Sequence, residues 1–319
     1  MKNIFTIIVF FTILTKFYAQ DAPKTSKMEA MEFRAYLMPG FGNLVTKNRV
    51  GDQMKTMLFN TNKGKFAYNW GVSGVYYYPI QKFTQIKLGY GFGLEHALYK
   101  SDLELLSYKS TFRAMDDTSI APQDSLMRTV TTGNVKENVK IHYINIPITL
   151  CNFVYLIPGD RWRIFMDLGI KLGFSTKSIY TGIGSFTSEG YYDVYNVKVD
   201  SLPEFGFYPN KSFDAKEQKL NTKTLNITGF VSLGTSYAIN SKIKLHAAFF
   251  YERGLRNISD YNAQQFQLAK YDHDYTSLIA PSKRIVNQGF GLQLGMIADM
   301  TSVVNVLKKV FKIRIVFVK

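Results

Sequence analysis

Residues 85–95 read QIKLGYGFGLE, and this stretch decides the fold class of the chain. Its even-numbered residues, from Ile86 to Leu94, are all apolar, whereas its odd-numbered residues are glycine, glutamine or charged. Successive side chains of a β-strand point to opposite faces, so the alternation predicts a strand with one apolar face and one small, polar face. Lys87 and Glu95 are the charges on the polar face.

The same alternation recurs in residues 162–174, 243–252 and 289–296. A soluble ligand-carrying barrel has the same period of two, so side-chain volume must decide which face points outward. The interior of an eight-stranded barrel is just wide enough for its inward side chains, and the bulky residues of every apolar face would overfill it. The apolar faces are therefore expected to point outward into lipid.

The connections between the predicted strands alternate between short and long. The short ones lie at residues 79–82, 157–160 and 240–241, and the long ones at residues 46–65, 98–138, 178–223 and 255–283. Short turns at one end and long loops at the other are typical of outer-membrane β-barrels. We therefore predict an all-β, antiparallel, up-and-down transmembrane β-barrel of eight strands with long extracellular loops and short periplasmic turns. Within the long connections, residues 190–199 are rich in Tyr and Val and favour a hairpin above the membrane.

The two ends of the chain differ from its middle. Residues 1–19 combine Lys2, an apolar run and a small-residue cleavage site, as a secretory signal peptide does. We assign residues 20–300 to the barrel and residues 301–319 to a basic tail on the periplasmic side, either an amphipathic helix or a further extended segment. The expected location is the cell outer membrane, reached by export through the signal peptide.

The charge and cysteine content restrict the partners. A formal net charge of +15 favours anionic partners, and export makes lipopolysaccharide and the lipid bilayer better candidates than nucleic acid, which we do not expect. The barrel-assembly machinery and surface or secretion-system proteins are the other expected partners. Cys151 is the single cysteine, so an internal disulfide is excluded.

Residues 143–148, with the sequence YINIPI, and the glycine-alternating hairpins resemble the PorT-like outer-membrane β-barrel family of Bacteroidetes. In that family the position of Asn145 usually carries an acidic residue, so this chain departs from the pattern there. The resemblance implies an outer-membrane barrel of mostly unknown activity, and one branch of the family takes part in protein secretion.

Six charged residues have the parity of the lumen face: Lys87, Glu95, Asp167, Lys171, Lys244 and Glu252. Counted upward from the short turns, Glu95, Lys171 and Glu252 reach similar heights. We hypothesise that Lys171 lies between the two carboxylates and that the cluster plugs the lumen, since charges in a narrow barrel must be paired or hydrated. The alternative is a solvated lumen wall without a closed network.

We expect no enzymatic activity, cofactor or metal, and a structural, binding or secretion-associated role. One alternative is a rim hydrolase, in which loop carboxylates and a histidine activate water: Asp116, Asp117, Asp272 and His273. A small porin is the other alternative, although eight strands leave little lumen.

Overall fold

The computed structural model describes residues 30–47, 58–79, 86–115, 125–157, 161–260, 276–280, 282 and 284–300. The expected signal peptide at residues 1–19 and the expected tail at residues 301–319 lie outside these ranges. No helix in the described part of the chain is long and apolar enough to cross a membrane.

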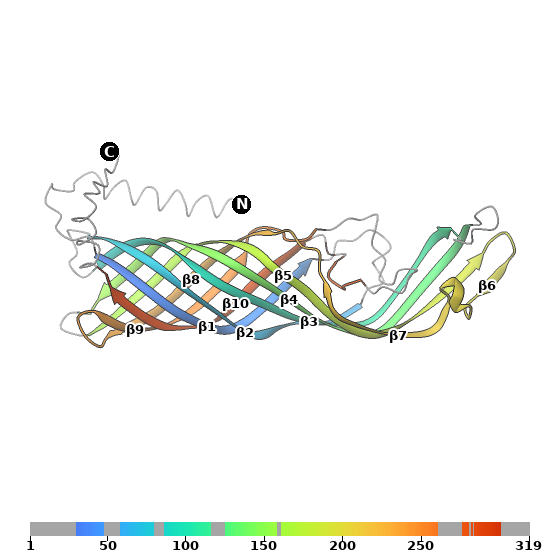
Figure 1. Cartoon of the computed structure of the whole chain (residues 1–319), viewed down its shortest axis with the longest axis horizontal. Helices are drawn as coiled ribbons and strands as arrows, with labels where there is room; N and C mark the ends of the chain where they lie inside the picture. Colours follow the sequence, from blue (N-terminus) through green and yellow to red (C-terminus); the bar gives the residue numbers. More distant parts are fainter. Residues whose placement is uncertain are drawn as a thin grey trace, which may run out of the picture.

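Eight described strands close into an antiparallel barrel (Figure 1). They are β1 (Ala30–Lys47), β2 (Leu58–Pro79), β3 (Ile86–Met115), β4 (Ser125–Leu156), β5 (Trp162–Tyr192), β8 (Leu225–Ala238), β9 (Ile243–Gly254) and β10 (Arg284–Asp299). Each pairs with the next around the ring, and β1 pairs with β10 from Glu32↔Asp299 to Lys47↔Arg284, which closes the ring. The predicted eight-stranded, up-and-down barrel is therefore confirmed.

The strands on the long-connection side extend well beyond the ring (Figure 1). β3 and β4 remain paired as far as Met115↔Ser125. Beyond the ring, β5 pairs with β6 (Val197–Val199) and with β7 (Tyr208–Lys219). The 3-10 helix η2 (Pro203–Phe205) lies between β6 and β7 in the chain. We call these parts of β3, β4 and β5, with β6 and β7, the extracellular sheet.

The expectation of long loops at residues 98–138 and 178–223 was therefore wrong, because most of these residues are in strands. A tilted strand needs only about 9 to 11 residues to cross a membrane, but the backbone pairing of β3, β4 and β5 continues well beyond that length. The buried residues of β4 continue to alternate with more exposed ones almost to its start at Ser125. The predicted hairpin at residues 190–199 is confirmed by the pairing Gly190↔Val199.

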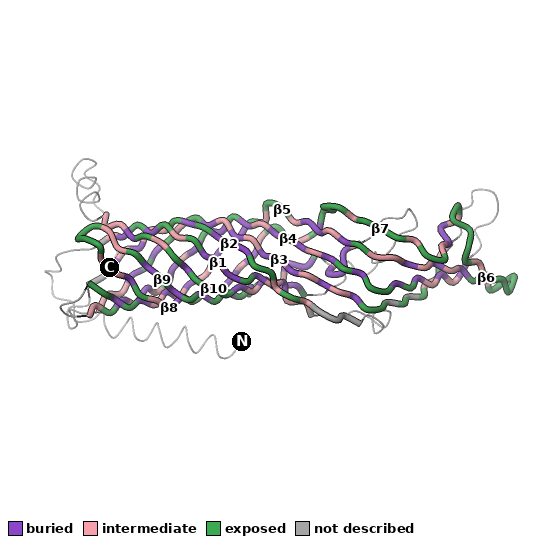
Figure 2. Tube along the Cα trace, turned by 90° about the horizontal axis from the view of Figure 1, so that it is seen from below, coloured by how far each residue is buried: buried purple, intermediate pink, exposed green. Residues whose placement is uncertain are grey.

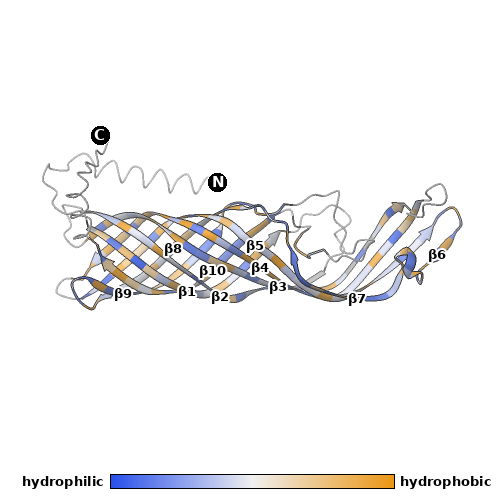
Figure 3. Ribbon diagram, in the orientation of Figure 1, coloured by the Kyte–Doolittle hydropathy of each residue, from blue (hydrophilic) through white to orange (hydrophobic). Residues whose placement is uncertain are grey.

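Buried and exposed residues alternate along the barrel strands, as Figure 2 shows. The outer wall is apolar, with Phe92 70% and Phe249 73% exposed. Other exposed apolar residues of this wall are Phe33, Leu37, Phe41, Val72, Leu94, Ile144, Ile146, Leu150, Ile164, Leu233, Leu245, Phe290, Leu292, Leu294 and Met296. Figure 3 shows hydrophobic residues distributed along the barrel strands. Such a surface is stable in hydrocarbon and costly in water.

Glycine allows neighbouring strands to coil closely around the barrel. At Gly93, an added Cβ atom would lie 2.2 Å from the carbonyl oxygen of Val72 on the paired strand. Only glycine tolerates this approach without a backbone shift, and such glycines introduce the curvature that a small closed barrel needs.

Candidate functional site

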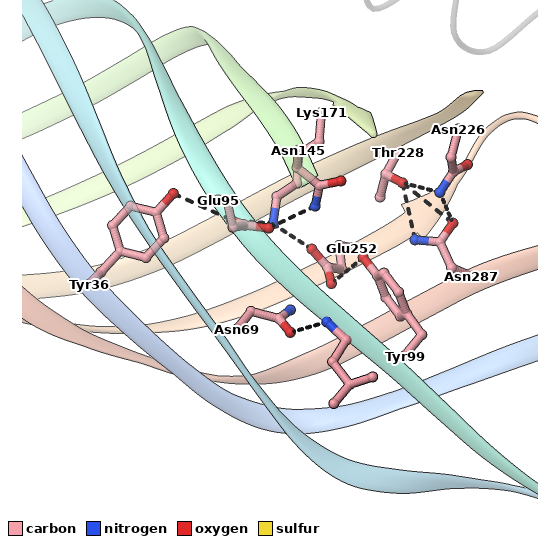
Figure 4. Close-up of polar contacts among 11 residues, drawn as sticks. Tyr36, Asn69, Glu95, Tyr99, Asn145, Lys171, Asn226, Thr228, Glu252 and Asn287 are labelled. Carbon is pink, nitrogen blue, oxygen red and sulfur yellow. Dashed lines mark hydrogen bonds and ion pairs between the residues drawn. The ribbon is translucent and has the colours of Figure 1, made fainter. Parts of the chain in front are cut away.

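The lumen contains a buried ion cluster built around Lys171 on β5. The Lys171 ammonium lies 2.7 Å from Glu95 Oε1 and 2.6 Å from Glu252 Oε2, and all three side chains are almost fully buried. The hydroxyls of Tyr99 and Tyr36 donate to Glu252 (2.7 Å) and Glu95 (3.3 Å), respectively. We call these residues, together with Asn145, the Lys171 cluster (Figure 4).

Backbone pairing brings the cluster together from distant parts of the sequence. Asn145 on β4 is the direct partner of Glu95 on β3, and its amide donates to Glu95 Oε1 at 3.0 Å. Gly289 leaves room for Glu252, because an added Cβ there would lie 2.8 Å from Glu252 Oε1. The small residues on the lumen face thus provide the space that the long charged side chains occupy.

A second ion cluster lies nearer the short turns. Glu32 on β1 accepts hydrogen bonds from Arg163, at 2.6 and 3.0 Å, and pairs with Lys244 at 2.5 Å. Arg34 pairs with Asp167 at 3.0 Å, and Asn152 also donates to Asp167. We call these residues the Glu32 cluster, and the hydroxyl of Tyr77 links its two halves by donating to Glu32 and accepting from Arg34.

The two clusters balance each other in charge and nearly meet. The Lys171 cluster has two carboxylates and one cation, whereas the Glu32 cluster has two carboxylates and three cations. A cavity of about 30 Å³, lined by Arg34 and Asp167 on one side and by Glu95 and Lys171 on the other, lies between them. This volume is enough for one or two water molecules and not for a solute.

An apolar plug covers the lumen on the extracellular side of the Lys171 cluster, and we call it the apolar cap. Its buried residues are Leu44, Ala97, Tyr99, Leu103, Leu105, Val135, Val139, Ile141, Tyr143, Tyr180, Leu220, Ile258, Leu278, Ile279 and Ile285. Glu137 holds residues 276–280 on it, because Ser277 Oγ donates to Glu137 Oε1 at 2.6 Å and the Leu278 amide donates to Oε2 at 2.9 Å.

The structure places five of the six predicted lumen charges in the two clusters. Glu95, Lys171 and Glu252 form one cluster, and Asp167 and Lys244 belong to the other. Lys87 is half-buried and has no ion-pair partner among the described residues, although the charge of Glu32 acts on it.

Sequence reasoning missed Glu32, Arg34 and Arg163. Arg163 has the same parity as Asp167, so the pattern of β5 contained the signal. Glu32 and Arg34 alternate with the exposed Phe33 in β1, but this strand contains Pro39 and Gly40, which obscure its pattern.

The residues proposed for a rim hydrolase, Asp116, Asp117, Asp272 and His273, lie outside the described residues. Within the described ranges, no group of three or more His, Cys, Asp or Glu side chains is arranged to hold a metal ion. Most of the charged groups described in the lumen are paired with one another or bonded to phenols, an arrangement that fills a pore.

Comparisons with known proteins give no family. No protein-family model matches the chain, and no curated protein matches it. Among solved structures, Neisserial surface protein A (NspA) is 10% identical over 84% of this chain and 96% of its own, with a TM-score of 0.29. Ail of Yersinia pestis, in complex with the heparin analogue sucrose octasulfate, is 8% identical; the match covers 85% of this chain and 99% of Ail, with a TM-score of 0.26. The outer membrane protease OmpT from Escherichia coli is 10% identical; the match covers 87% of this chain and 100% of OmpT, with a TM-score of 0.31.

These TM-scores are low, so the fold assignment rests on the strand pairing and on the two faces of the wall. A closed antiparallel ring satisfies its backbone hydrogen bonds without water, as a structure within lipid must. Its outer wall is apolar and its lumen is charged. Strands of this kind, with short turns at one end and long extensions at the other, make the chain an outer-membrane β-barrel protein.

Proposed function

We propose that this protein is a non-enzymatic, non-conducting barrel that anchors the extracellular sheet in the outer membrane for binding or secretion. The observation that carries the proposal is the filled lumen, in which the Glu32 cluster, the Lys171 cluster and the apolar cap follow one another along the barrel axis. A lumen packed in this way supports a structural anchor better than a pore or a catalytic cleft.

The extracellular sheet supports the binding part of the proposal, because it ends in an ordered tip. Arg128 on β4 donates to the carbonyl oxygen of Gly206 at 2.6 Å and to Ser188 Oγ at 3.0 Å, and its guanidinium lies over the ring of Phe207. These contacts fix the connection between β6 and β7 on the sheet. Binding residues are commonly placed on such connections above a rigid scaffold.

The tip carries exposed apolar side chains, which we call the tip patch: Tyr191, Val194, Tyr195, Val197 and Leu202. Exposed apolar residues that cluster in this way mark interaction sites on many proteins. We propose that the tip patch contacts a surface protein or a component of a secretion system.

We also propose that this chain is related to the PorT-like family of outer-membrane barrels. The support for this relationship is the motif at residues 143–148, whose Asn145 contacts Glu95 in the Lys171 cluster. An acidic residue at this position, as is usual in the family, would add a third carboxylate around a single lysine. The departure therefore fits the charges that surround it in this chain.

Planar-bilayer conductance tests the closed lumen. We expect the purified, heat-modifiable barrel to give no current steps, because the cavity between the ion clusters admits only water. A porin inserted in the same bilayers is the positive control. Stable, discrete conductance steps of the wild-type protein would favour the small porin instead.

Substitutions in the tip patch test the binding role. The test is whether the protein restores surface attachment or protein secretion in a strain from which its gene is deleted. We expect the wild-type protein to do so and the triple variant Val194→Ser, Tyr195→Ser, Leu202→Ser to fail. The barrel should still fold, because these side chains are exposed. Leu106→Ser with Ile183→Ser, also at exposed positions of the same sheet, is the matched control. Equal activity of the tip variant and this control would contradict a role for the tip patch.

A further inference from the structure

The outer wall has a concentration of positive charge where the barrel passes into the extracellular sheet. Three lysines on three adjacent strands form it, and we call them the outer-wall cations: Lys100 on β3, Lys140 on β4 and Lys177 on β5. Figure 1 shows these three strands side by side in this region.

Strand pairing places two of these lysines directly opposite each other and the third close by. Lys100 pairs with Lys140, and Lys177 pairs with His142, two positions along β4 from Lys140. The sequence neighbours of both Lys100 and Lys140 are buried in the lumen, so the two lysines point outward. Like charges opposite each other on one face of a sheet are destabilising, and an anion from outside the chain would relieve this repulsion.

The protein itself supplies little negative charge at this height. Among the described residues, Lys100 and Lys140 have no carboxylate partner, and Lys177 pairs only with the exposed Glu217 at 3.3 Å. The nearest acidic residue on the outer face of β3, Asp102, already has Lys65 as a partner at 2.7 Å and accepts from Asn138 at 2.6 Å. Lys100 and Lys140 are therefore left for a ligand, and Lys177 has only an exposed carboxylate beside it.

The position of the outer-wall cations identifies the kind of ligand. Directly below them, the side chain of Trp70 is 58% exposed and stacks on the His96 ring, with the ring centroids 5.8 Å apart. The exposed Ile144 and Phe174 continue the apolar wall at the same level, paired across β4 and β5. An aromatic residue at the top of an apolar wall marks the boundary between acyl chains and headgroups. The outer-wall cations thus lie in the headgroup layer of the outer leaflet.

We propose that the outer-wall cations bind the phosphate groups of a phosphorylated glycolipid of the outer leaflet, with Trp70 against its acyl chains. Lysine ammonium groups are effective point-charge ligands for phosphate. Their long stems can follow the apolar wall while the charge reaches the headgroup. The lipid would neutralise the facing lysines and fix the height of the barrel in the membrane.

The test uses the full-length protein in detergent and the fluorescence of Trp70. The chain has two tryptophans, so Trp162→Phe leaves Trp70 as the single reporter. Titration with diphosphorylated lipid A is expected to shift the Trp70 emission. The triple variant Lys100→Gln, Lys140→Gln, Lys177→Gln should weaken binding on the order of 100-fold, because each lysine near an anionic lipid surface contributes roughly a factor of five.

Two further triple variants separate charge at this place from charge in general. Arginine at positions 100, 140 and 177 keeps the charge and should retain the binding. Lys198→Gln, Lys211→Gln and Lys216→Gln remove the same charge from the extracellular sheet and should leave binding unchanged. An equal loss of lipid A binding in this control variant would contradict the proposed site. Undiminished binding by the variant with glutamine at positions 100, 140 and 177 would contradict it as well.

The choice of ligand is tested with three other probes. Lipid A without phosphates and phosphatidylglycerol are expected to bind at least about tenfold more weakly, since the first lacks the charge and the second has a single phosphate. Inorganic phosphate should compete only weakly, because it lacks the acyl chains. Equal binding of dephosphorylated lipid A or of phosphatidylglycerol, or full competition by free phosphate, would contradict the proposed glycolipid.

Discussion

Replacing Lys171 with methionine is expected to lower the free energy of unfolding by about 3 to 5 kcal/mol, because it removes one partner of a buried ion cluster. Glu95 and Glu252 would then lie close together in the lumen without a cation between them. The tyrosine hydroxyls that donate to them stabilise the carboxylates but do not neutralise them.

The temperature at which the compact, unboiled gel band converts to the unfolded band measures this loss. Lys171→Met combined with Glu95→Gln and Glu252→Gln should recover most of the stability, since no unpaired charge then remains. Lys198→Met, at an exposed lysine paired with Glu189, is the matched control and should change stability by less than about 0.5 kcal/mol. An unchanged conversion temperature for Lys171→Met would contradict the ion cluster.

Replacing Glu32 with glutamine should destabilise the barrel to a similar extent, about 3 to 5 kcal/mol. Glu32 is the acceptor for both Arg163 and Lys244, so its loss leaves two cations without an anion at one height. The remaining carboxylate of the cluster, Asp167, is already paired with Arg34.

Denaturant unfolding in detergent, followed by tryptophan fluorescence, gives this free energy directly. Adding Arg163→Met and Lys244→Met to the Glu32 variant should restore stability, because the cations are then absent as well. Glu189→Gln is the control at an exposed ion pair, where a change below about 1 kcal/mol is expected. A loss for Glu32→Gln no larger than that of this control would exclude a structural role for the cluster.

The barrel and part of its lumen could be predicted from the sequence, because both follow from the alternation of apolar and polar residues along the strands. Counting from the short turns placed Glu95, Lys171 and Glu252 at similar heights, and backbone pairing then determined which side chains face each other. The same counting failed above the membrane. Residues 125–138 of β4 continue to alternate between buried and more exposed positions where lipid no longer requires strands, although this stretch was expected to lie in a long connection.

The apolar cap could not be predicted, because it depends on tertiary contacts. Glu137 on β4 accepts hydrogen bonds from Ser277 and Leu278, which lie some 140 positions later in the chain. Nothing in the local pattern of either segment indicates this contact. The tyrosines that complete the ion clusters were missed for a related reason, since a tyrosine on a strand fits either face.

Gel mobility of the protein from the outer-membrane fraction, with and without boiling in detergent, is the most direct test of a closed membrane barrel. We expect a faster band without boiling that converts to the full apparent mass on heating, because a closed ring of paired strands resists detergent until it is heated. A single unshifted band found in the soluble periplasmic fraction would contradict the membrane barrel.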